Sequence, residues 1–99
     1  MSASVDAHLG TTGLTTTLHA RQHRFTGDEP PEKGGQDQGP TPYELVLGGL
    51  ATCTAVTLRM YAERKGWPLA GVDVHVEMDA GPEGRAAVRR LLTLAGPLD

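Results

Sequence analysis

The sequence of 99 residues is poor in cysteine and in aromatic side chains, with Cys53, one Trp, one Phe and two Tyr. A single cysteine excludes a disulfide within these residues, so Cys53 is an inert buried thiol, a reactive thiol or a link to another molecule. Nine Lys and Arg stand against twelve Asp and Glu, for a net charge of -3. Scattered basic residues and few aromatics argue against nucleic acid as a partner.

Long apolar runs are also absent. The N-terminus has no basic stretch followed by an apolar one, so it does not resemble a signal peptide. The longest uncharged stretch, residues 45–58, is shorter than the roughly 20 residues that a bilayer span needs. We therefore expect a cytoplasmic protein with no membrane contact, folded as one domain over residues 1–99 with a small core.

Alternating apolar and polar residues predict strands in both halves of the chain. Residues 5–9 and 14–20 predict a hairpin, and residues 23–26 a weaker third strand. Residues 72–78 predict the clearest strand, with residues 85–95 as its antiparallel partner. In that partner the residues expected to face inward are Val88, Leu92 and Leu94.

Turn-forming residues separate these strands. Residues 10–13 and 80–84 predict turns, and residues 27–40, rich in Gly, Pro and charge, predict a surface loop. Residues 96–99 are compatible with the start of a further helix or with a frayed tail.

A long helix is predicted between the two strand regions. Thr41 at the N-cap, Pro42 at the first helical position and Glu44 at the third form a capping box. The helix can continue to Lys65, because Gly66 can adopt the left-handed conformation that ends a helix.

The middle of this helix should be covered on every side. Residues 45–58 carry no charge, and apolar or small side chains occupy every angle around the axis. A domain of this size can cover one side of the helix with its own sheet, so a second copy of the chain is the simplest cover for the rest. Gly48 and Gly49 favour close approach of a partner helix, although they could instead pack against the chain's own sheet.

Cys53 lies on one face of this helix, and a cysteine in such a place is commonly a core residue. A reactive thiol here would need an arginine or histidine from elsewhere, because the residues that share its face are Val46, Gly49, Leu50, Val56, Thr57 and Met60.

Glu44 precedes Cys53 by nine residues, which places it on the opposite face and about 13.5 Å along the axis. In an antiparallel pair of helices, Glu44 of one copy could orient a cation such as Arg24 or Arg21 beside the partner's Cys53, or it could act only in the capping box.

Residues 28–69, DEPPEKGGQDQGPTPYELVLGGLATCTAVTLRMYAERKGWPL, strongly resemble the signature of the superfamily of osmotically inducible protein C and organic hydroperoxide resistance protein (OsmC/Ohr). The resemblance is especially to its branch of general OsmC-like proteins. The resemblance implies an α+β fold, with an antiparallel sheet and a long central helix in an intertwined homodimer. It also implies a thiol-dependent peroxidase that reduces organic hydroperoxides in oxidative-stress defence, with its redox site at the dimer interface.

The resemblance also implies roles for individual residues. Cys53 resembles the peroxidatic cysteine, Glu44 the glutamate that holds an arginine near it, and Arg24 that arginine, with Arg21 as the alternative. Family members usually continue beyond this point with a second helix and a resolving cysteine, which these residues lack. We therefore expect a C-terminally truncated member that uses an external thiol or dithiol as reductant.

A second reading is a dimeric scaffold without catalysis, or a protein that binds a small apolar ligand. No metal or cofactor is expected. His19 and His23, four residues apart on a strand, point the same way without being close, and the glycine-rich GGQDQG lacks the Lys and Ser or Thr of a phosphate-binding loop.

Overall fold

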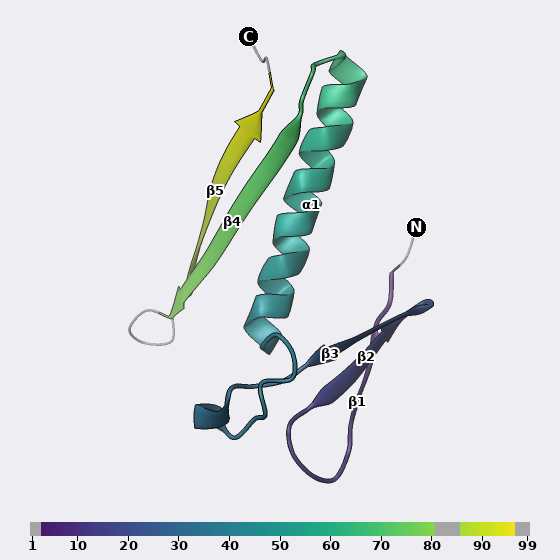
Figure 1. Cartoon of the computed structure of the whole chain (residues 1–99), viewed down its shortest axis with the longest axis vertical. Helices are drawn as coiled ribbons and strands as arrows, with labels where there is room; N and C mark the ends of the chain where they lie inside the picture. Colours follow the sequence, from purple (N-terminus) through teal and green to yellow (C-terminus); the bar gives the residue numbers. More distant parts are fainter. Residues whose placement is uncertain (1–2, 81–85, 97–99) are drawn as a thin grey trace. The chain divides into compact units, whose positions relative to one another are not determined.

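A computed structural model describes residues 3–80 and 86–96 of the chain, which adopt the expected α+β fold with antiparallel sheets and one long helix (Figure 1). The chain comprises two compact units, Met1–Leu45 and Val46–Asp99. The predicted turn at residues 80–84 and the predicted tail at residues 96–99 lie largely outside the described residues.

The N-terminal unit contains a three-stranded antiparallel sheet in the order β1-β2-β3. The predicted hairpin is present, and the weaker third strand is confirmed; the strands are β1 (Asp6–Leu9), β2 (Thr16–Ala20) and β3 (His23–Gly27). Leu18, which is half-buried, lies opposite Ala7 and Phe25 on one face of the sheet, whereas His19 lies opposite Arg24 on the other face. The period of two in the sequence therefore separates the two faces correctly.

The loop that follows β3 is a fixed structure rather than a loose connector. It contains the short 3-10 helix η1 (Pro31–Lys33) and is organised by Asp28, whose exposed fraction is 2%. Thr15 Oγ1 donates to Asp28 Oδ2 at 2.8 Å, and the same oxygen accepts from the N–H of Gln38 at 3.2 Å. The N–H of Glu29 donates to the other oxygen, Oδ1, at 2.7 Å. One carboxylate thus ties the start of the loop to its end and to the preceding hairpin.

Helix α1 (Pro42–Lys65) begins and ends where the sequence predicts. In the capping box, the N–H of Thr41 donates to Glu44 Oε1 at 2.8 Å and the N–H of Glu44 donates to Thr41 Oγ1 at 3.2 Å. At the other end Gly66 has a φ of 72°, which a residue with a Cβ adopts only at a cost.

The end of α1 is a complete Schellman motif. The N–H of Trp67 donates to the carbonyl of Ala62 at 2.8 Å, and the N–H of Gly66 donates to that of Glu63 at 3.2 Å. The apolar contact that accompanies this motif is made by the rings of Trp67 and Tyr61, which meet edge to face with centroids 5.3 Å apart.

The C-terminal unit contains most of α1 and a two-stranded antiparallel sheet of β4 (Gly71–Ala80) and β5 (Ala86–Ala95). Figure 1 shows α1 running beside β4, whose apolar residues from Val72 to Met78 are half-buried. The strand residues predicted to face inward do share this face of the sheet, but the prediction that they are buried is wrong for the single chain. Their exposed fractions are 47% for Val88, 43% for Leu92 and 45% for Leu94.

The protonation of Asp28 should affect the stability of the N-terminal unit. Burial raises the pKa of Asp28, but hydrogen bonds lower it by more, so the pKa lies below its ordinary value of 3.8. The donors of these bonds are the Thr15 hydroxyl and the backbone N–H groups of Glu29, Gln38 and Gln36. A lowered folded-state pKa contributes stability above the unfolded value, and this contribution disappears as the pH falls through the folded value.

We expect Asp28→Asn to lower the free energy of unfolding at neutral pH, because the amide presents an N–H₂ where Thr15 and Gln38 both donate. The difference between wild type and variant should shrink as the pH falls from about 6 to about 2. Urea unfolding across this range measures it. A constant difference at all pH values would show that the Asp28 carboxylate is not the stabilising species.

Candidate active site

Helix α1 presents one covered stripe to its own sheet. Ala62 is its one buried residue among those described, and the half-buried residues of the same stripe are Leu47, Ala51, Thr54, Ala55 and Leu58. Arg59 Nη1 also donates to the carbonyl oxygen of Leu69 at 2.8 Å, which joins the helix to the segment before β4. One side of the helix is therefore packed within the chain.

The opposite side of the helix is an uncovered apolar surface, here called the Cys53 stripe, made of Val46, Gly49, Leu50, Cys53, Val56, Thr57 and Met60. The exposed fraction is 64% for Val46 and 61% for Met60, and Cys53 is an exposed free thiol at the middle of the stripe. These are the residues that the sequence predicts to share a face. The expectation of cover on all sides is not met within one chain, which leaves this stripe open.

The glycine pair does not pack against the chain's own sheet. A Cβ built on Gly48 or Gly49 would meet nothing within 4 Å among the described residues. That alternative is therefore wrong for the single chain, and close approach of another molecule remains the prediction.

Taken over its full length, α1 is also long and apolar enough to cross a membrane, which the uncharged core of residues 45–58 is not. This is weak support for a membrane span, since core helices of soluble proteins have the same length and composition.

Glu44 is engaged in the capping box at the start of α1. Its carboxylate accepts from the N–H of Thr41, and its side chain is exposed. Capping is therefore the role that its contacts show.

Arg24 and Arg21 lie on the N-terminal sheet. Arg24 Nε and Nη2 each lie 3.3 Å from His19 Nε2, and both side chains are exposed. Arg21, at the β2–β3 turn, donates to Gln22 Oε1 at 3.4 Å. Arg24 and Glu44 share the N-terminal unit but bond to different partners, and Cys53 belongs to the C-terminal unit. The contacts within each unit thus do not assemble the three predicted site residues.

Comparison with known proteins identifies the family. Residues 35–96, more than half of the chain, match the family model described as OsmC-like protein. The chain belongs to the OsmC-like family. No curated protein matches it.

A solved structure with the same fold comes from Legionella pneumophila and is described as "organic hydroperoxide resistance protein OsmC, predicted redox protein, regulator of sulfide bond formation". The two chains share 20% sequence identity with a TM-score of 0.67, over 97% of this chain and 72% of that one. At this identity the likeness shows the OsmC fold alone.

Sequence reasoning missed one cation of this OsmC-like chain that lies close to the Cys53 stripe. Arg90 of β5 donates from Nη1 to Thr54 Oγ1 of α1 at 3.1 Å, and Thr54 directly follows Cys53 in the chain. The strand pattern of the sequence could have revealed Arg90. Because Arg90 shares a face of β5 with Leu92 and Leu94, it is a charged residue at a position where an apolar one is expected.

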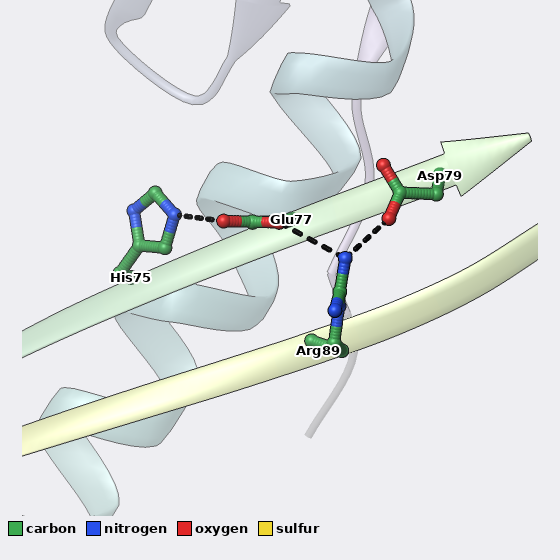
Figure 2. Close-up of polar contacts among 4 residues, drawn as sticks. All are labelled: His75, Glu77, Asp79 and Arg89. Atoms are coloured by element: carbon green, nitrogen blue, oxygen red, sulfur yellow. Dashed lines mark hydrogen bonds and ion pairs between the residues drawn. The ribbon is translucent and has the colours of Figure 1, made fainter.

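On the outer face of the same sheet, four ionisable side chains are joined by close polar contacts (Figure 2). Glu77 Oε1 lies 2.9 Å from His75 Nε2, while Arg89 donates to both Glu77 Oε2 and Asp79 Oδ2. All four side chains are exposed, and within the described residues no group of three His, Cys, Asp or Glu is suited to hold a metal ion. Exposed pairs of this kind contribute at most about 1 kcal/mol each.

The capping box allows the carboxylate charge of Glu44 to be separated from its structural role. Gln can take the place of Glu in a capping box. We expect Glu44→Ala to lower the free energy of unfolding by roughly 0.5–1 kcal/mol, and Glu44→Gln to change it by less. Chemical denaturation of the three proteins measures this, and equal stability of the Ala variant and wild type would contradict the structural role.

Proposed function

We propose that this OsmC-like protein is a thiol-dependent peroxidase that reduces organic hydroperoxides in defence against oxidative stress. The observation that carries the proposal is the exposed thiol of Cys53 at the middle of an apolar stripe, in a chain of this family. The description of the Legionella protein as an organic hydroperoxide resistance protein supports the same class of substrate.

The reaction needs one nucleophile and one acid. The Cys53 thiolate attacks the terminal oxygen of the hydroperoxide, the O–O bond breaks, and the alkoxide leaves as an alcohol after it gains a proton. Cys53 becomes a sulfenic acid. A first external thiol then forms a mixed disulfide with Cys53 and releases water, and a second thiol restores Cys53 and leaves as the oxidised disulfide.

A homodimer completes the proposed site. Covering an apolar side chain is worth about 1.5–3 kcal/mol when its burial is complete, so an open stripe with four large apolar residues favours a second copy. In an antiparallel arrangement of two α1 helices, Glu44 of one copy orients Arg24, or Arg21 in its place, toward the partner's Cys53. The guanidinium stabilises the thiolate and the negative charge on the departing oxygen.

The surroundings of Cys53 support the choice of substrate and of compartment. Leu50 and Val56, each about one helical turn from Cys53, would pack against the organic part of a hydroperoxide, which hydrogen peroxide lacks. The proposed reductant of the Cys53 sulfenic acid is an external thiol or dithiol. A reducing cytoplasm supplies such thiols.

A second candidate function is a dimeric scaffold that binds a small apolar ligand without catalysis. The capping box favours it, because the one role that contacts show for Glu44 is structural. In that case Cys53 is an ordinary interface residue.

The test is the rate at which Cys53 forms sulfenic acid with cumene hydroperoxide and with hydrogen peroxide, by stopped flow and intact mass. We expect faster oxidation by the organic peroxide, and a loss of at least about tenfold in Arg24→Ala, because the activating cation is removed. Glu44→Gln, which keeps the capping box, should also slow the reaction. Oxidation at the rate of an ordinary free thiol, unchanged in both variants, would exclude the peroxidase and leave the scaffold.

A further inference from the structure

Arg90 occupies an unusual position for a charged residue. In the register of the C-terminal sheet it lies opposite Val76, on the face of the sheet that packs toward α1. The other side chains described on this face from residue 72 to residue 94 are all apolar, namely Val72, Val74, Val76, Met78, Val88, Leu92 and Leu94. Arg90 is exposed in the single chain, and a guanidinium that becomes buried against such an apolar face needs an anion or a set of acceptors.

The contact with α1 fixes where this charge lies. Arg90 Nη1 donates to Thr54 Oγ1 at 3.1 Å, while Thr54 Oγ1 donates in turn to the carbonyl of Leu50 at 2.8 Å. Successive residues of a helix are about 100° apart, which places Thr54 at the edge of the covered stripe nearer to Cys53. The guanidinium therefore stands beside the helix turn that carries Cys53, at the border of the Cys53 stripe.

The neighbouring arginine provides a contrast. Arg89 points to the opposite face of the sheet, where Glu77 and Asp79 neutralise it (Figure 2). Arg90 has no carboxylate partner among the residues that the structure describes; its hydrogen bond there is to Thr54. Of these two adjacent cations, only Arg90 keeps its charge available to another anion.

We propose that Arg90 supplies positive charge to the Cys53 thiolate and is a second supporting cation of the site. The inference rests on the proposed function for its role in peroxide reduction. When a second copy covers the Cys53 stripe, water is removed from the space around the guanidinium and the sulfur, and their attraction strengthens. Arg90 bonds to Thr54 rather than to the sulfur, so its effect acts at longer range and should be smaller than that of an arginine in direct contact.

The adjacent arginines allow a matched test. In the protein of residues 1–99, the rate of Cys53 alkylation by iodoacetamide is measured across pH for wild type, Arg90→Met, Arg90→Lys and Arg89→Met, together with oxidation by cumene hydroperoxide at neutral pH. We expect Arg90→Met to move the alkylation profile to higher pH and to slow both reactions by about threefold or more, because loss of a nearby cation disfavours the thiolate. Arg90→Lys should retain most of the reactivity, and Arg89→Met should match wild type.

Alkylation and oxidation together distinguish failure of the Arg90 proposal from failure of the proposed peroxidase. An alkylation profile of Arg90→Met identical to that of wild type would overturn the role of Arg90. Equal shifts in Arg89→Met and Arg90→Met would also overturn it, because they would arise from the overall charge of the protein. If wild type reacts with cumene hydroperoxide no faster than a free thiol, the proposed peroxidase fails. The alkylation profiles still decide whether Arg90 supports the thiolate in that case.

Discussion

The structure depends on one constraint. Residues 45–58 of helix α1 have apolar or small side chains on every side, but the chain's own sheet covers one side only. The covered stripe, from Leu47 to Ala62, packs within the chain, and the Cys53 stripe stays open. Exposed apolar surfaces of this kind commonly bind a protein, a membrane or a ligand, and we propose a second copy of the chain here. The position of the thiol follows directly, because Cys53 lies at the middle of the open side and not in the core of the chain.

Separate contacts define the conformation within each of the two units. The capping box at Thr41 and the Schellman motif at Gly66 fix the two ends of α1. Asp28 fixes the loop before the helix by accepting from both of its ends, and Arg90 and Arg59 join the helix to the segment after it. Two arginines that are adjacent in the chain thus have unlike roles, since the alternation of the strand sends Arg89 to solvent and Arg90 to the helix.

Much of this could be predicted from the sequence because the deciding interactions are local. The capping box, the helix end at Gly66, the alternation of β4 and the members of the Cys53 stripe depend on residues a few positions apart. Asp28 and Arg90 could not be found in this way, since their partners Thr15 and Thr54 lie 13 and 36 residues distant. The exposure of Val88, Leu92 and Leu94 was mispredicted for a related reason, because a strand pattern shows which face is apolar but not what covers it.

Whether a second copy covers the Cys53 stripe can be measured by sedimentation velocity on wild type, Val46→Glu and Leu91→Glu. Val46 and Leu91 are almost equally exposed in one chain, at 64% and 65%, but Val46 lies on the stripe and Leu91 on the outer face of the sheet. We expect wild type and Leu91→Glu to be dimers and Val46→Glu to be a monomer, because burying an unpaired carboxylate in an interface is costly. A monomeric wild type, or a Val46→Glu dimer as stable as that of Leu91→Glu, would contradict it.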